Sequence, residues 1–251
     1  MGQGRKPAGS PGGSGGQFDS NGGRFDRKEL PDPTGVPVIP RYGAFSAPGA
    51  RLRGADLSGR ELDYLPGADL IDANLEKADI SAGSLDRAHL EGANARGAKF
   101  LKTSLDHTHM AGADLMGASL RMARLDHTDM RFVNLSLASL DGAHITDTRF
   151  NKADMTGADL SGATISDTSF YGASMTSVNL RGAALDHCDM SDADIRGLDL
   201  SNATVSDLTV SDSTRLDGVT FSRDQMGRIR DSNGRFVGEK TLTERGATVI
   251  D

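Results

Sequence analysis

Residues 67–80 read Gly-Ala-Asp-Leu-Ile-Asp-Ala-Asn-Leu-Glu-Lys-Ala-Asp-Ile, so an apolar residue recurs at every fifth position. This series runs from Leu65 to Val210 with only the small Ala95 interrupting it, and a small or apolar residue stands two positions before each member after the first. A period of five matches neither a helix, on which it would spread apolar residues around every face, nor a straight strand, on which an odd step alternates sides. The sequence therefore predicts a chain that turns every five residues and points two side chains of each five inward.

Three similar segments indicate how many residues make one turn of this coil. Residues 105–110 read Leu-Asp-His-Thr-His-Met, and close copies begin at Leu125 and Leu185, at offsets of 20 and 60. Twenty residues are four units of five, so four corners would close a square. The two inward columns would then hold Thr108, Thr128, Thr148, Thr168 and Cys188 beside Met110, Met130, Phe150, Phe170 and Met190. Small residues beside large ones would fill a narrow interior.

Glycine follows the same period at three of the four expected corners, as at Gly92, Gly97 and Gly142. The fourth corner instead carries Arg87, His107, His127, Asp147, Asp167, His187 and Asp207. Because glycine favours turns that need a positive φ, the sequence predicts a different turn type at this fourth corner. One side of the coil should be chemically distinct.

These units resemble the pentapeptide repeat family, whose consensus is Ala-(Asp/Asn)-Leu-X-X, as in residues 68–70, 113–115 and 158–160. The resemblance covers about two thirds of the chain and implies an all-β fold, a right-handed quadrilateral parallel β-helix. We expect a disordered Gly/Ser/Pro-rich tail over residues 1–45, the β-helix over 46–221, and a C-terminal capping helix with a polar tail over 222–251. A capping-box pattern at Ser222 and Gln225 predicts where that helix begins.

Two breaks interrupt the register of the repeat. It slips by two residues between Asp63 and Leu65, and one extra residue moves it to Leu216 and Phe221.

The open C-terminal end could also pair two chains, as it does in some relatives, so the resemblance implies a homodimer there. Asp19-Ser20-Asn21-Gly22-Gly23-Arg24-Phe25 nearly repeats at Asp231-Ser232-Asn233-Gly234-Arg235-Phe236 and is either a linear docking motif or a product of biased composition.

Composition excludes several classes of protein. The 251 residues include one cysteine, which rules out a disulfide scaffold, a zinc ribbon and a CxxC redox protein. We interpret Cys188 as a small core residue. No apolar run approaches the length of a membrane span, and none follows the N-terminal residues as in a signal peptide, so we expect a soluble, cytoplasmic protein without membrane contact.

Catalytic and cofactor motifs are missing from the sequence. It contains no phosphate-binding Gly-x-x-x-x-Gly-Lys, no dinucleotide-binding Gly-x-Gly-x-x-Gly and no His-Glu-x-x-His. We therefore predict no enzyme, no catalytic residues and no cofactor. His89, His107, His109 and His127, with Asp106, Asp126 and Asp129 nearby, could share a metal or respond to pH, or they could form a solvated face. Since their spacing fixes no ligand set, the sequence predicts no metal.

Acidic residues are concentrated toward the C-terminal end of the repeats. Residues 154–217 contain 11 acidic and 3 basic side chains, a net charge of 3 - 11 = -8, whereas residues 51–153 contain 15 and 13, or -2. We predict a partner-binding acidic face formed by Asp154, Asp159, Asp167, Asp186, Asp189, Asp192, Asp194, Asp199, Asp207 and Asp212. The period places Asp154 and Asp194 in one outward column, Asp159 and Asp199 in the next, and Asp189 in another. Regularly spaced carboxylates on a rigid rod could present a DNA-like field to a basic groove. Aspartate could equally serve only to keep the outward positions soluble.

The family resemblance adds a concrete partner. Some pentapeptide repeat proteins, including quinolone-resistance proteins, are understood as DNA mimics that bind DNA gyrase. The sequence therefore favours a non-enzymatic protein-binding solenoid, an acidic DNA mimic that binds DNA gyrase or another DNA-binding protein without binding nucleic acid itself. The alternative is a structural scaffold or spacer rod that docks other proteins through its flexible tails.

Overall fold

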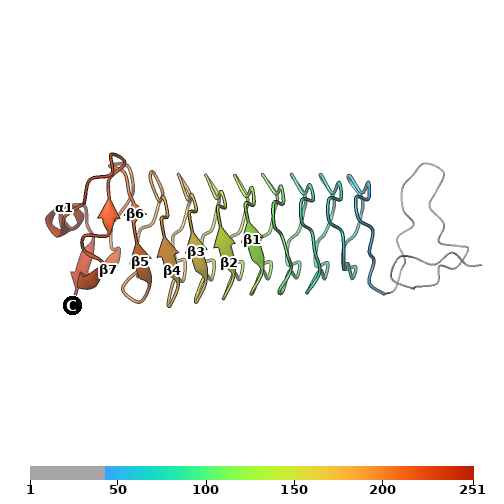
Figure 1. The fold of residues 1–251 in the computed structure, drawn as a ribbon, viewed down its shortest axis with the longest axis horizontal. Coiled ribbons are helices and arrows are strands. Elements are labelled where there is room, and N and C mark those ends of the chain that lie inside the picture. Colours follow the sequence, from blue (N-terminus) through green and yellow to red (C-terminus); the bar gives the residue numbers. More distant parts are fainter. Residues whose placement is uncertain (1–42) are drawn as a thin grey trace, which may run out of the picture.

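The backbone bends at every fifth residue and stacks into a rod of parallel coils, as the computed structural model shows for residues 43–251, the described part of the chain (Figure 1). Each coil pairs in parallel with the coil twenty residues further on. One uninterrupted ladder of such pairs joins eight coils through Tyr64, Ser84, Ser104, Arg124, His144, Thr164, Ala184 and Thr204. The predicted square solenoid of twenty residues per turn is confirmed.

On one side of the rod the pairing extends over three residues and forms a five-stranded sheet. Its strands are β1 (Arg124–Asp126), β2 (His144–Thr146), β3 (Thr164–Ser166), β4 (Ala184–Asp186) and β5 (Thr204–Ser206). Elsewhere in the repeats most pairs are single bridges. Right-handedness follows from the family resemblance and stays a prediction.

The interior is filled by the two inward columns that the period predicts. Leu70, Leu120 and Ile165 are fully buried. Most buried threonines donate to the preceding coil, as Thr108 Oγ1 does to Leu85 O at 2.9 Å and Thr148 Oγ1 to Leu125 O at 2.7 Å, whereas Thr168 Oγ1 donates to Ser166 O at 2.8 Å. Cys188 replaces threonine in this column, with Sγ 3.8 Å from Ile165 O, and burial raises the pKa of its thiol to about 12. It is a core residue, as predicted.

The aspartate or asparagine of each repeat has a structural task that the sequence did not reveal. Its side-chain oxygen accepts the backbone N–H two residues later, as at Asp154 to Thr156 N (3.0 Å) and Asp159 to Ser161 N (3.0 Å). Asn134 does the same for Ser136 N at 3.0 Å. Such Asx turns satisfy the backbone at the corner. Aspartates at this position of the repeat therefore close turns, so their presence alone does not indicate a binding role.

At the fourth corner the expected difference in φ is wrong, although the turn itself does differ in the later coils. The residues of this corner also have positive φ, from 48° at Asp147 to 59° at Arg87, so the lack of glycine there does not reflect a different φ. From His127 onward this corner is a bend, whereas the other corners of these coils, apart from a bend at Ala203, are mainly hydrogen-bonded turns. Non-glycine residues also occupy the left-handed conformation at other corners, as at Lys77 and Phe132, but from Arg87 to Asp207 only this edge lacks glycine altogether.

Both breaks in the register appear in the structure. Arg51 pairs with Asp69, and Glu61 pairs with Asp79, a spacing of 18 residues, before Tyr64 pairs with Ser84. Near the other end, Asp194 pairs with Arg215, a spacing of 21 residues. Pairing begins at Phe45 with Leu62, so the coil includes the last residue of the predicted tail, and the rest of that tail up to residue 42 lies outside the described residues.

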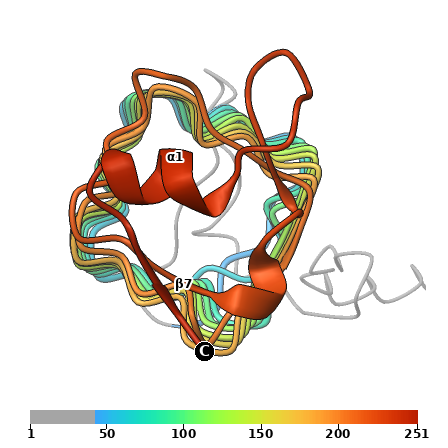
Figure 2. The same cartoon turned by 90° about the vertical axis from the view of Figure 1, so that its left-hand side faces the viewer.

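The C-terminal segment closes the rod differently from the predicted helix at Ser222. Residues Arg223–Gln225 form only one turn of 3-10 helix (η2), after which Met226 is extended, with ψ 137°. The helix that lies across the end of the coil is α1 (Glu239–Glu244), with Leu242 buried beneath it (Figure 2). A capping helix is thus confirmed but begins later. Pairing of two chains through this end stays a prediction.

Long-range pairing, rather than the local cap, anchors this segment. Strand β6 (Leu208–Thr209) pairs with β8 (Ile229–Arg230), and β7 (Thr220–Ser222) pairs with β9 (Thr248–Ile250). Gln225 is buried and donates to Leu200 O (2.7 Å) and Ala203 O (2.8 Å). Within residues 43–251, no helix combines the length and apolar character that crossing a bilayer requires.

Acid is expected to destabilise the rod. Arg131 and Arg196 hold the pKa of Asp129 and Asp194 below the usual value for aspartate. Between the folded and unfolded pKa values the unfolded chain binds more protons, so these groups contribute stability that is full above about pH 4 and falls as the pH drops through the folded values. Urea unfolding between pH 2 and pH 6, a window of roughly two units on either side of the unfolded value, measures this slope.

The double variant Arg131→Gln and Arg196→Gln should flatten that pH dependence. Arg181→Gln is the matched control, because the Arg181 side chain forms no ion pair with any described residue. An unchanged slope in the double variant, or an equal change in the control, would contradict the assignment.

Candidate interaction surface

The ten aspartates predicted to form one face are spread around the rod. Asp154 and Asp194 lie on one side, in the bridge ladder that also contains Ser174. Asp159 and Asp199 lie on the next side, and Asp189 on a third, between Ser169 and Thr209. All five accept the N–H of their own turn, as Asp199 does from Ser201 at 3.0 Å. These residues do not meet on a single surface.

Two more of the ten lie at a neighbouring corner near the C-terminal end. Asp192 accepts Ser211 Oγ at 2.7 Å, and contacts with Tyr171 and Ser211 lower its pKa. Asp212 follows Ser211 in the chain, and its carbonyl lies 3.4 Å from Nη2 of Arg245. Asp194 is neutralised by Arg196 (2.8 Å) and Arg215 (3.0 Å). The net charge of residues 154–217 therefore overstates the negative potential at the C-terminal end of the rod.

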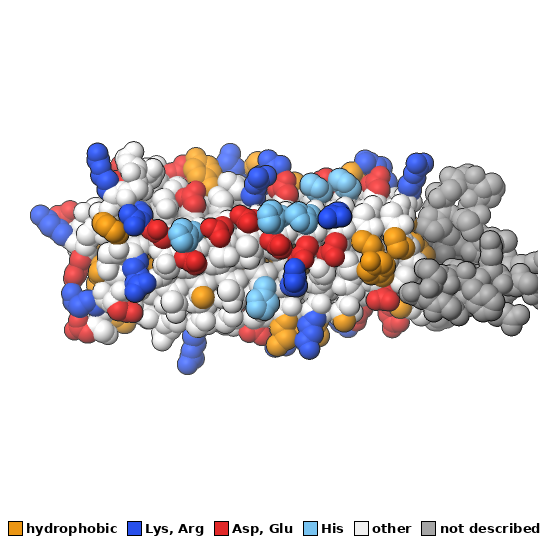
Figure 3. Space-filling model, viewed as in Figure 1, with side chains coloured by type: hydrophobic (Ala, Val, Ile, Leu, Met, Phe, Trp, Pro, Cys, Tyr) orange, Lys and Arg blue, Asp and Glu red, His pale blue; other side chains and the backbone are white. Residues whose placement is uncertain are grey.

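The remaining three, Asp167, Asp186 and Asp207, lie along the fourth corner, where the structure adds four aspartates that the prediction omitted. We call this set the corner ladder, and it consists of Asp86, Asp106, Asp126, Asp147, Asp167, Asp186 and Asp207. Figure 3 shows acidic side chains and imidazoles in a stripe along this side of the rod. The sequence signal for the omitted members was their offset: Asp86, Asp106 and Asp126 follow one another at intervals of 20.

Contacts of the corner ladder differ along its length. Asp86 and Asp106 accept the backbone N–H of the aspartate one coil on, at 3.0 and 3.3 Å, and Asp106 also binds Arg124. At the far end Asp207 binds Arg230. In between, Asp167 forms no ion pair with any residue from 43 to 251. Neutralisation along the ladder is therefore uneven, since arginine neutralises Asp106 and Asp207, whereas Asp86 and Asp167 form no ion pair within these residues.

The four histidines grouped by the sequence form two separate stacks. His107 and His127 stack at the corner, with ring centroids 4.8 Å apart. His89 and His109 stack on the adjoining side, also at 4.8 Å, in the bridge ladder that continues to Asp129. Only the first pair belongs to the edge that carries the corner ladder. The sequence places these histidines on one face or its corner, and the structure has one pair at each of these two places.

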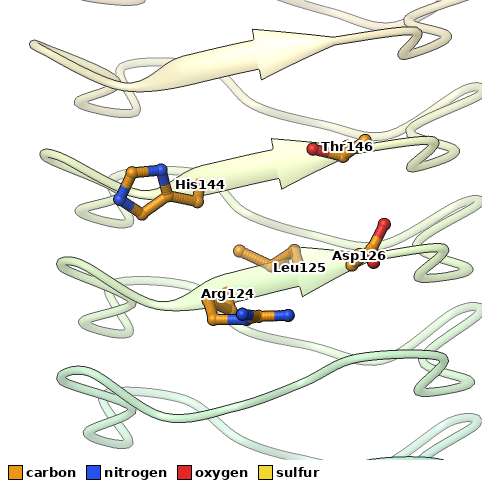
Figure 4. Close-up of a pocket in the computed structure, with 5 residues that line it drawn as sticks. All are labelled: Arg124, Leu125, Asp126, His144 and Thr146. Atoms are coloured by element: carbon orange, nitrogen blue, oxygen red, sulfur yellow. The ribbon is translucent and has the colours of Figure 1, made fainter.

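Two shallow surface hollows open beside the corner ladder. One is lined by Tyr64, Pro66, Gly67, Asp86, Arg87, Asp106 and His107. The other lies over β1 and β2, where Arg124 and His144 stand at one end of the strands and Asp126 and Thr146 at the other (Figure 4). Leu125 of the packed core also lines this hollow, and its side chain is 1% exposed or less. These shapes suit contact with another macromolecule better than enclosure of a small substrate.

One comparison with known proteins, the match to a family model, agrees with this architecture. A family model described as pentapeptide repeats matches in eight copies, over segments 84–121, 96–131, 118–157, 138–176, 153–192 and 173–207. No curated protein matches the chain. Among solved structures, QnrB1, a plasmid-mediated fluoroquinolone resistance protein, is 12% identical over 83% of this chain and 94% of its own, with a TM-score of 0.42.

A second solved structure is HetL, a pentapeptide repeat protein involved in heterocyst differentiation regulation from the cyanobacterium Nostoc sp. strain PCC 7120. It is 19% identical over 76% of this chain and 92% of its own, with a TM-score of 0.37.

Proposed function

The chain belongs to the pentapeptide repeat family, and from that premise we propose that it is a non-enzymatic binding protein whose corner ladder binds a basic surface on a DNA-binding protein. The observation that supports this proposal is the position of the carboxylates. Asp147 and Asp167 occupy a corner that lacks glycine from Arg87 to Asp207, whereas the other corners mix glycine with other residues. Within residues 43–251 neither carboxylate closes an Asx turn, unlike Asp154. DNA gyrase is the partner to test first, because the family resemblance names it.

The geometry of the corner ladder fits an extended basic partner. From Asp86 to Asp207 the ladder spans (207 - 86)/20, or six coils, and coils about 4.8 Å apart give roughly 29 Å. A line of like charges on a rigid rod focuses its field on one edge. Partners that bind DNA phosphates present lysine and arginine along a comparable path. Binding should therefore weaken with rising salt.

Neutralising the corner ladder should weaken partner binding. The double variant Asp86→Asn and Asp167→Asn removes two charges, and neither carboxylate forms an ion pair in the described part of the chain. We expect about a tenfold loss of affinity at low salt, mainly through slower association. Titration of gyrase supercoiling, with and without a quinolone, and direct binding at two salt concentrations measure it.

Asp154→Asn and Asp159→Asn form the matched control. They remove the same charge from other sides of the rod, and asparagine still closes the turn there, as Asn134 does. This control should bind like the unaltered protein. Equal losses in both double variants would show that only net charge matters, and no effect of micromolar protein on gyrase would exclude gyrase as the partner.

The scaffold alternative is supported by a different feature. Arg230 pairs with Phe236 in an antiparallel hairpin, and the Phe236 side chain is 61% exposed. The segment that nearly repeats this hairpin sequence, residues 19–25, lies outside the described residues. If the tails dock partners, deleting residues 1–42, which leaves Phe45 in its coil, should abolish binding while the ladder variant should not.

A further inference from the structure

Asp126, His127 and Asp147 meet on the corner ladder in an arrangement that suits a metal ion. Asp126 Oδ1 lies 2.8 Å from Nδ1 of His127, and Asp147 Oδ2 lies 3.4 Å from Nε2 on the opposite edge of the same ring. One ligand atom from each residue falls within 4.8 Å of the others. The three side chains are between 38% and 51% exposed, so an ion can reach them from solvent.

We propose that His127 Nε2 and Asp147 Oδ2 bind a divalent transition metal such as Zn²⁺, with Asp126 orienting the imidazole. Zinc binds nitrogen and carboxylate oxygen at about 2.0–2.2 Å in tetrahedral geometry. Two such ligands lie about 3.3 Å from each other, and the observed separation of Nε2 and Oδ2 is 3.4 Å. A carboxylate on the second ring nitrogen is the usual partner of a metal-bound histidine. Water or a partner's side chain would complete the coordination.

The same Asp-His-Asp arrangement occurs a second time in the rod, and there its second aspartate binds a cation. Three coils further on, His187 Nδ1 lies 2.9 Å from Asp186 Oδ1, and His187 Nε2 lies 3.8 Å from Asp207 Oδ2. Here the chain supplies the cation itself, because the guanidinium of Arg230 binds Asp207. By contrast, within residues 43–251 no lysine or arginine forms an ion pair with Asp147. The first copy is therefore open to an external cation, and Arg230 keeps the second copy closed.

The contacts of Arg230 explain why it stays in place. Its Nη1 donates to Gly234 O at 3.1 Å, and its guanidinium carbon lies 4.2 Å from the centre of the Phe236 ring. The hairpin thus holds the guanidinium over Asp207. A third Asp-His pair, Asp106 and His107, is followed one coil on by His127 rather than aspartate, so it lacks the second ligand.

Metal titration of the chelator-treated full-length chain tests both copies at once. Calorimetry with ZnCl₂, supported by metal content after equilibrium dialysis, should give one equivalent for the unaltered protein. Arg230→Gln should give two equivalents, and adding His187→Ala to that variant should return the value to one. Each variant is first checked for folding by circular dichroism.

Single substitutions assign the ligands. His127→Ala and Asp147→Asn should abolish the site, whereas His144→Ala and His109→Ala should leave it unchanged. Asp126→Ala should weaken zinc binding by about 10-fold to 100-fold, and Asp126→Asn, whose amide oxygen still accepts from Nδ1, should restore most of the affinity. This rescue separates an orienting role from a ligand role.

Three outcomes of these titrations would overturn the zinc site at His127 and Asp147. The proposal is overturned by the absence of saturable zinc binding, by binding that survives His127→Ala, or by binding that is lost in His109→Ala. A stoichiometry that stays at one in Arg230→Gln would overturn the assignment of Arg230 as the cation of the second copy. None of these titrations contains a protein partner, so they are independent of the function proposed above.

Discussion

Replacing Phe150 by alanine is expected to lower the free energy of unfolding by about 3–5 kcal/mol. Phe150 is fully buried, and its ring stacks on that of Phe170 with centroids 5.3 Å apart. Backbone hydrogen bonds tie the coil to its neighbours, as Phe150 N to Ser169 O (2.7 Å), so the walls cannot collapse into the space that the ring leaves. Urea unfolding followed by circular dichroism measures the loss.

Phe132→Ala is the control for this substitution. Phe132 is the same residue type in a nearby coil, but its side chain is 59% exposed at a corner with φ 59°. Alanine there should change stability by no more than about 0.5 kcal/mol. Similar losses from the two substitutions would mean that the rod is not held together by its interior columns.

The repeat alone predicted most of the fold, because burial in a solenoid depends on position within the period. Every fifth residue from Leu65 to Val210 is buried, and the same rule placed Thr108 and Cys188 inside. Both changes of register, near Asp63 and before Leu216, could be read from the spacing of the apolar residues. Because each coil contacts only the adjacent coils, the burial of a residue can be predicted without knowing any contact between more distant segments.

The period correctly predicted that Asp154 and Asp194 share one column and that Asp189 lies in another, but the ten acidic residues were chosen by net charge along the chain rather than by a shared column. A step of five residues moves a side chain by a quarter turn, so Asp154 and Asp159 lie on different sides. Position within the period of twenty would have grouped Asp86, Asp106 and Asp126 instead. The sequence also does not distinguish an aspartate that accepts a backbone N–H in its own turn from one whose carboxylate is free to bind a partner.

The C-terminal closure could not be predicted from local signals. The capping box at Ser222 identified the start of a helix correctly, and Gln225 Oε1 accepts from Ser222 N at 3.0 Å. That helix ends after one turn because Gln225 Nε2 is drawn into the last coil and Met226 is extended. What covers the end depends on the pairing of β7 with β9 across more than twenty residues, which no pattern near Ser222 encodes.

Replacing Gly83 by alanine is expected to open the first coils. A Cβ at this position would lie 2.1 Å from the carbonyl oxygen of Asp63, which accepts the N–H of Ser84 at 2.9 Å. Corresponding positions carry alanine, such as Ala88, but the shortened coil before Tyr64 brings the Asp63 backbone too close. Because the contact is with backbone, relief requires breaking this pairing, a loss of about 3 kcal/mol.

The damage should be local, because each coil of a solenoid contacts only its neighbours. Amide hydrogen exchange should accelerate by roughly 100-fold for Leu65, Leu70 and Leu75 while that of Ile165 stays unchanged. Gly117→Ala is the control: with φ 65° and no atom within 4 Å of its new Cβ, it should cost only about 1 kcal/mol of conformational strain. Equal acceleration in both variants would mean that the shortened coil does not require glycine at residue 83. Acceleration spread over the whole rod would instead contradict the independence of distant coils.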